Sequence, residues 1–206
     1  YPVVTPLAVD SGHPFPFLTN HTINAIVRIF QILPDGTKDY KIAILPIPSV
    51  LDRIIEIPSR GNKEHRFVYL EDVITYYANQ FFQGYGIEDY MVFRITRDAD
   101  LEIDEEEATD LLSEVEESLR RRRRGDAVRL EVCGDVKDHL LDFVLTSVEL
   151  EQKDVYRIDG HLDCRMYFDF CNYPGLDELR YEPFDSKIPS ELVDHEGDSL
   201  FSIIGK

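Results

Sequence analysis

Several residue patterns that carry familiar chemistry are missing from this chain of 206 residues. The sequence has no Gly-x-x-x-x-Gly-Lys phosphate loop and no Gly-x-Ser-x-Gly nucleophile elbow. Its six histidines are scattered, and neither the His-x-x-x-His nor the Cys-x-x-Cys spacing of common metal sites occurs. The sequence therefore contains no constellation of residues that would carry a reaction by itself.

Cysteine, positive charge and long apolar runs are also scarce. The three cysteines, Cys133, Cys164 and Cys171, are an odd number at unremarkable spacing, which is typical of a reducing cytosol rather than a disulfide framework. The formal net charge of −18 argues against a nucleic-acid-binding protein, because a polyanion would be repelled at long range. No apolar run is long enough to cross a bilayer. Residues 1–4 lack an initiator methionine and a signal-peptide pattern, which predicts the interior of a longer chain.

The first twenty residues are rich in proline and aromatic side chains. Proline at this density prevents a helix and favours an extended path. Phe15 and Phe17 are too apolar for a loose tail, so the segment is predicted to dock on the domain. His13 has two interpretations, a functional residue or a ring that hydrogen-bonds locally to hold the turn. We prefer the structural turn, because no second ligand or nucleophile lies near His13 in the sequence.

The next elements follow from hydrophobic periodicity and turn residues. Residues 23–33 and 41–47 predict two strands that form a hairpin across the turn at 34–37. Residues 51–57 are ambiguous between a short helix and a strand. The remaining predictions are strands at 65–70 and 155–158, amphipathic helices at 71–82 and 135–148, and a short helix at 162–170.

The stretch from Met91 to Val132 carries the most information. Apolar residues alternate with polar ones at 91–96 and again at 128–132, which predicts two strands. Between them, an acidic segment has helical periodicity, with Asp104 as the predicted N-cap and Gly125 as the stop. This order predicts a βαβ-like unit, whose strands should be parallel if they are neighbours in the sheet.

Arginines of this stretch are candidates for contact with an anion such as phosphate. Arg94 and Arg97 flank the end of the preceding strand. The run at 120–124 stands at the end of the predicted helix, where arginines also favour the helix dipole and have acidic residues nearby to pair with. A solvated helix end is therefore the preferred reading of that run. Alternating acids from Asp98 to Asp104 resemble part of a calcium loop, but Ile103 replaces the required glycine, so no metal site is expected. The anion candidates are Arg94, Arg97, Arg120, Arg121 and Arg124.

The sequence Phe93-Arg94-Ile95-Thr96-Arg97-Asp98-Ala99-Asp100-Leu101-Glu102, with the arginine run and Gly125-Asp126-Ala127-Val128-Arg129-Leu130-Glu131-Val132, resembles the middle or head domain of bacterial polyphosphate kinase. Further similar motifs occur in the family's order: His13-Pro14-Phe15-Pro16, Val155-Tyr156-Arg157-Ile158-Asp159-Gly160 and Leu179-Arg180-Tyr181-Glu182-Pro183-Phe184. That family transfers the terminal phosphate of ATP to polyphosphate.

The resemblance implies a role without catalysis for this segment. In the family, a phosphorylated histidine in the C-terminal domains carries the phosphoryl group, and the adenine contacts lie largely in the N-terminal domain, so no catalytic residue is carried over. The head domain contributes to a homodimer and helps to wall the active-site tunnel. ATP and magnesium belong to the full-length cytoplasmic phosphoprotein, as does any peripheral membrane association, and this segment is expected to bind no cofactor. Its negative charge also argues against a major polyphosphate-binding surface.

Together these observations predict an α+β fold with a mixed β-sheet, built from the N-terminal hairpin and the βαβ-like unit, with helices packed on it. The predicted organisation is a proline-rich entry segment at 1–20, a head-domain core at 21–172, and a linker or arm at 173–206. The predicted partners are the N- and C-terminal domains of the same enzyme and a second copy. The alternative function is an independent acidic protein-interaction domain. A His-His-Pro-Tyr-like continuation after Lys206 would favour the kinase.

Overall fold

The computed structural model describes residues 3–58, 65–98 and 125–187. The chain forms two compact units, residues 1–167 and residues 168–206. The first unit contains a six-stranded mixed sheet and a separate two-stranded sheet, so the predicted α+β class is confirmed. None of the helices in the described ranges combines the length and apolarity needed to cross a membrane.

The six-stranded sheet has the strand order β1-β3-β2-β6-β7-β8. The predicted hairpin is confirmed, since β2 and β3 are antiparallel with Ile26 opposite Ile44. Every neighbouring pair in this sheet is antiparallel except β7 and β8. The strands are β1 (Leu7–Val9), β2 (Ile23–Ile32), β3 (Lys38–Pro46), β6 (Gly86–Arg97), β7 (Ala127–Cys133) and β8 (Val155–Ile158).

The prediction of parallel strands around the acidic segment is wrong. β6 and β7 are antiparallel neighbours, with Ile95 opposite Leu130. The Asp98 N–H donates to the Asp126 carbonyl at 2.9 Å, so the chain leaves and re-enters the sheet at the same end. The end of β6 therefore lies beside the start of β7, as in an antiparallel pair. The predicted helix with its Asp104 cap lies outside the described residues.

A parallel unit does occur, one element later in the chain. Strand β7 leads into helix α3 (Asp138–Val148), which leads into β8, and Leu130 lies opposite Val155 in the parallel pair. The helix starts three residues later than the predicted 135. It ends where Glu149 adopts the left-handed conformation with φ of 58°.

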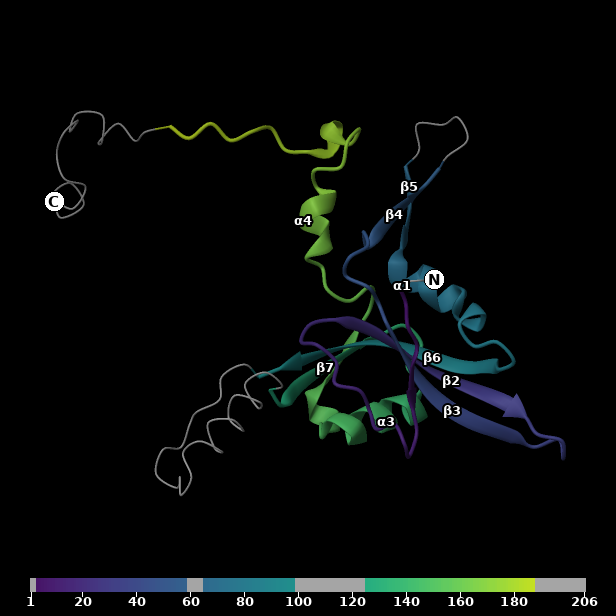
Figure 1. The fold of residues 1–206 in the computed structure, drawn as a ribbon. Coiled ribbons are helices and arrows are strands. Elements are labelled where there is room, and N and C mark those ends of the chain that lie inside the picture. Colours follow the sequence, from purple (N-terminus) through teal and green to yellow (C-terminus); the bar gives the residue numbers. More distant parts are fainter. Residues whose placement is uncertain (1–2, 59–64, 99–124, 188–206) are drawn as a thin grey trace, which may run out of the picture. The chain divides into compact units, whose positions relative to one another are not determined.

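Helix α3 covers one face of the six-stranded sheet (Figure 1). Alternation along β6 sends Met91, Phe93 and Ile95 to this face, where each is almost completely buried. The helix contributes an apolar stripe of three- and four-residue spacing. Its buried members are Leu140, Leu141, Val144 and Leu145.

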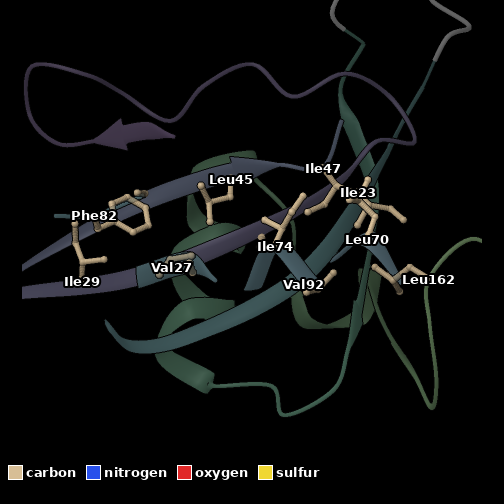
Figure 2. Packing of buried hydrophobic residues seen from close by; sticks show 13 residues of the cluster. Ile23, Val27, Ile29, Leu45, Ile47, Leu70, Ile74, Phe82, Val92 and Leu162 are labelled. Atoms are coloured by element: carbon tan, nitrogen blue, oxygen red, sulfur yellow. The ribbon is translucent and has the colours of Figure 1, made fainter. Parts of the chain in front are cut away.

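The opposite face carries a second apolar cluster, shown in Figure 2, which is centred on β2, β3 and the α1 region. Helix α1 (Leu70–Tyr76) is shorter than the predicted helix at 71–82, because Tyr77 leaves helical geometry at φ −96° and ψ 15°. A 3-10 turn, η1 (Ala78–Gln80), follows. This change of path still brings Phe82 into the cluster, where it is 8 % exposed.

The ambiguous segment at 51–57 proves to be a strand. It contributes β4 (Ile54–Ile57), which pairs antiparallel with β5 (Arg66–Tyr69). The entry segment docks as predicted, since Leu18 is buried and the Phe15 ring lies 6.3 Å from the Phe143 ring. The remaining short elements are η2 (Gln152–Asp154), α4 (Met166–Phe170) and η3 (Asp177–Leu179).

Candidate functional site

A hollow of about 850 Å³ lies in the first unit at the carboxyl ends of the parallel strands β7 and β8. Open α/β arrangements commonly bind ligands at this end of parallel strands. Gly134 follows β7 with φ of 75°, and Gly160 follows β8 closely with φ of 131°. Because this backbone region favours glycine, the two residues allow the chain to turn away from the sheet and leave the hollow open.

The lining of the hollow is acidic. Six carboxyl groups line it, together with two permanently charged cations, Lys137 and Arg157. An anion such as a phosphate chain would therefore be repelled from this surface. The carboxyl residues are Glu71, Asp72, Glu88, Asp89, Asp135 and Asp159.

The most buried charge in this region is Glu71, which is 2 % exposed at the start of α1. Both carboxylate oxygens accept hydrogen bonds at 3.1 Å from Nε of Arg53, which precedes β4. Arg53 also donates from Nη1 to the Asp163 carbonyl at 2.7 Å. This arginine therefore connects the base of the β4–β5 hairpin to α1 and to the loop after β8.

His161 lies beside the same helix. Its Nδ1 is 3.6 Å from Glu71, its Nε2 is 3.9 Å from Asp72, and its ring stacks on Tyr69 with centroids 3.4 Å apart. Burial, together with a 2.6 Å hydrogen bond to the Tyr167 hydroxyl, raises the pKa of Tyr69 to about 12. At neutral pH the Tyr69 phenol is protonated and serves as a structural hydrogen-bond group.

A second buried network crosses β6 and β7. Arg94 forms an ion pair with Glu131, the residue directly opposite it in the antiparallel register. Arg129 contacts the same carboxylate at 2.8 Å, and its guanidinium lies 3.9 Å from the centre of the Tyr156 ring. Arg94 also lies 3.3 Å from Asp163. These contacts fix the loop after β8 onto the sheet.

The Asp163 carboxylate titrates at unusually low pH. A hydrogen bond from the Arg165 side chain is the main cause, the Arg94 charge adds to it, and the pKa of Asp163 is lowered to about 2. A carboxyl group whose pKa is lower in the folded protein stabilises the fold above its unfolded pKa. That contribution is lost as the pH falls through the folded value.

We expect the Asp163→Asn variant to unfold about 2 kcal/mol more easily than the wild type near pH 6. The difference should shrink as the pH falls from about 4 towards 2, because the wild-type carboxyl group becomes neutral. Urea unfolding at a series of pH values measures it. Asp159→Asn is the control, since Asp159 makes no ion pair within the described ranges. A difference that stays constant with pH would contradict this assignment.

Cys133 lies at the end of β7 beside the hollow. Burial, with the Glu71 charge adding to it, raises the pKa of this thiol to about 11. The thiolate is the reactive form of cysteine, so Cys133 is a poor nucleophile at neutral pH.

We expect two thiols of the native protein, the exposed Cys164 and Cys171, to react quickly with DTNB at pH 8. Cys133 should react about 100-fold more slowly, because so little of it is ionised. Guanidinium-unfolded protein should show three equally fast thiols. Three fast thiols in the native protein would disprove the protected state of Cys133.

One group of side chains has the donor atoms of a metal site. Single ligand atoms of Glu88, Asp89 and His139 lie within 4.8 Å of one another. Two cations already neutralise the carboxylates, since Arg28 lies 3.1 Å from Glu88 and Lys137 lies 3.9 Å from Asp89. A metal ion would compete with both, so this arrangement favours an ion-paired surface.

The residues predicted from sequence do not converge on the hollow. His13 lies in the predicted structural turn, where its Nδ1 is 3.0 Å from a carboxylate oxygen of Asp10, and its side chain is mostly exposed. Arg94 is buried among carboxylates in the interior of β6, where an anion would have to displace Glu131 and Asp163. Arg120, Arg121 and Arg124 lie outside the described residues.

Arg97 borders a separate hollow of about 430 Å³ near the C-terminal end of α3. Its side chain donates to the carbonyls of Leu18 at 3.0 Å and Gly125 at 2.9 Å. Asp126 and Glu149 also line this hollow, and a helix C-terminus carries a negative partial charge. The surroundings disfavour an anion, and the contact stays a prediction.

Sequence reasoning missed Arg53, Glu71, Glu131 and Asp163, which form the buried networks. The sequence contained one signal: Glu131 stands between Leu130 and Val132 in the strand, so its side chain lies on the opposite face of the sheet from theirs. The position of a polar residue in this alternation does not show whether it faces solvent or is covered by a loop from elsewhere in the sequence. The partners are brought together only by the tertiary fold.

The fold and the networks define a framework domain, a mixed sheet covered by helices in which buried charges hold loops in place. Residues 1–170 match the family model described as the polyphosphate kinase middle domain, and the chain belongs to this family. The prediction from the sequence motifs is thereby confirmed.

Relatives extend the match beyond the family model. The chain is 36% identical over 206 residues to polyphosphate kinase of Pseudomonas putida, and 42% identical over 196 residues to that of Halalkalibacterium halodurans. It covers 28% and 27% of these two relatives, so it spans little more than a quarter of their length. The crystal structure of polyphosphate kinase from Porphyromonas gingivalis has the same fold, with a TM-score of 0.68, 20% identity and coverage of 98% of this chain and 28% of that one.

Proposed function

We propose that this chain is the non-catalytic middle domain of an enzyme that transfers the terminal phosphate of ATP to polyphosphate. The phosphoryl group is carried by a histidine outside this chain, and ATP and magnesium bind to other parts of the enzyme. The middle domain supports a cytoplasmic homodimer and helps to wall the active-site tunnel. Family membership and the small share of the relatives' length that the chain covers support this division of labour.

The state of the potential nucleophiles carries the proposal. Four histidine rings lie against carboxylates: His13, His65, His139 and His161. The thiol of Cys133 stays protonated because of its raised pKa. A phosphoryl acceptor needs an accessible, deprotonated atom aligned with the leaving group. We assign these contacts of the described residues to structure, because the family's phosphorylated histidine is expected outside this chain.

The acidic hollow supports a second part of the proposal, that polyphosphate runs elsewhere. Six carboxyl groups on one surface would raise the free energy of a bound polyanion. A domain that walls a tunnel for polyphosphate is therefore expected to turn this surface away from the polymer.

Labelling with radioactive ATP and magnesium tests the division of labour. The 206-residue chain and the longer polypeptide that contains it are incubated in parallel, and acid-labile phosphohistidine is measured on each. We expect label on the longer polypeptide and none on the chain alone. A phosphohistidine on the chain itself would overturn the proposal.

Light scattering on the same two samples tests the assembly role. We expect the longer polypeptide to have the mass of a dimer. An enzyme that makes polyphosphate as a monomer would exclude a role for this domain in a homodimer.

A further inference from the structure

The second unit exposes large apolar side chains along one short segment, residues 176–187, which we call the acidic arm. Leu179, Tyr181 and Phe184 are 76%, 101% and 90% exposed. Each such side chain gains about 1.5–3 kcal/mol when it moves from water into an apolar environment. Three such side chains lie within six residues of the sequence, which is denser than the scattered single exposures that are normal for soluble proteins.

The start of the arm is held in a defined turn by one arginine. Arg180 donates from Nε to the Cys171 carbonyl at 2.9 Å and from Nη2 to the Tyr173 carbonyl at 3.2 Å. Its Nη1 lies 3.0 Å from Asp177. Fixing a binding segment before it meets its partner lowers the entropy lost on association. The turn that holds Leu179 is therefore fixed before binding, and residues 181–187 follow it without regular secondary structure.

The comparisons indicate what lies next to the arm in the chain. The family model for the middle domain ends at residue 170, whereas the Pseudomonas putida relative matches all 206 residues. The arm thus follows the middle domain in polypeptides that are more than three times longer than this chain. The nearest surfaces available to it belong to the same polypeptide.

Charge decides between that polypeptide and a second copy of this chain. The arm carries four carboxyl groups and two cations, Arg180 and Lys187, so its formal net charge is −2; the carboxyl groups are those of Asp177, Glu178, Glu182 and Asp185. Two such arms facing one another would repel, so a contact between the arms of two copies is disfavoured. A groove with an apolar floor and a rim of lysine or arginine complements both the exposed rings and the acids.

We propose that the acidic arm docks into an apolar, basic-rimmed groove on another domain of the same polypeptide, with Leu179, Tyr181 and Phe184 as anchors. This inference rests on the proposed function, because it needs the longer kinase polypeptide. The docking would fix the direction in which the chain leaves the middle domain.

Hydroxyl-radical footprinting tests the docking, because it measures the solvent access of individual side chains. The samples are the 206-residue chain and the longer polypeptide, and buried Phe93 reports that both are folded. We expect Tyr181 and Phe184 to be modified at least tenfold more slowly in the longer polypeptide. Equal rates in the two samples would overturn the inference. Protection that appears in the chain alone and grows with its concentration would overturn it too, in favour of a second copy.

Variants locate the anchors. In the longer polypeptide, Tyr181→Ser with Phe184→Ser should expose Leu179 and raise its modification rate about tenfold. Val50→Ser is the matched control, since Val50 is 79% exposed and lies in the first unit. It should leave Leu179 protected, and an equal effect of both changes would contradict the anchor role. Phosphohistidine labelling of the same samples separates the docking from the proposed function. A labelled enzyme with an exposed arm would refute only the docking. An unlabelled enzyme with a protected arm would refute only the proposed function.

Discussion

Replacing Glu71 with alanine is expected to lower the free energy of unfolding by about 3–5 kcal/mol. The Glu71 side chain is almost fully buried, and the side chain of Arg53, which it binds, is 16% exposed. Removing the carboxylate leaves this arginine charged and largely desolvated, which costs more than the lost contacts alone. Urea unfolding of the chain at neutral pH measures the change.

A double-mutant cycle separates the cost of the unpaired charge from a general loss of packing. Arg53→Met combined with Glu71→Leu removes both charges and should recover most of the lost stability. Asp135→Asn is the surface control, because the Asp135–Lys137 pair is exposed and such pairs contribute less than about 1 kcal/mol. If Glu71→Ala lowers the free energy of unfolding no more than this control does, the network does not stabilise the fold.

The second large effect is expected from Phe93→Ala, at about 3–5 kcal/mol of unfolding free energy. Phe93 is 0% exposed and lies between the sheet and α3, in the same core cluster as the buried α3 residues. The truncation loses the transfer free energy of the ring and leaves a cavity that the sheet and helix can only partly fill. Urea or thermal unfolding measures this loss.

The control for Phe93 lies three residues away on the same strand. Tyr90 points to the other face of β6 and is 48% exposed. Tyr90→Ala should cost less than about 1 kcal/mol, since it removes no buried ring. Similar losses for both changes would mean that the α3 face is not the main core.

Local patterns in the sequence were sufficient for most strands. Alternation of apolar residues identified β7 and the second half of β6, apolar runs identified β2, β3 and β8, and the turn at 34–37 identified the first hairpin. Period-two patterning reports which residues share a face, but it does not report which strand is the neighbour or in which direction it runs. That is why β6 and β7 were expected to be parallel, although their ends meet at Asp98 and Asp126.

The same limit explains why the charged networks were missed. Arg94 and Glu131 are direct partners only in the antiparallel register, so the wrong direction hid their ion pair. Arg53 and Asp163 are 110 residues apart in sequence and meet through the packing of the loop after β8. Their polar character matched a solvated surface equally well. No local property of the sequence predicts that a loop will cover such residues.

The junction between β6 and β7 has a consequence for how this domain can vary. A hydrogen bond between Asp98 and Asp126 joins the end of β6 to the start of β7, so the pairing of these strands does not depend on the length of the chain between them. The entropy cost of closing such a loop rises only slowly with its length. The junction itself is far less tolerant, since a β-carbon at Gly125 would lie 2.0 Å from the Asp98 carbonyl oxygen. We therefore expect a change in the length of this connection to cost the domain little stability, whereas replacing Gly125 should be costly.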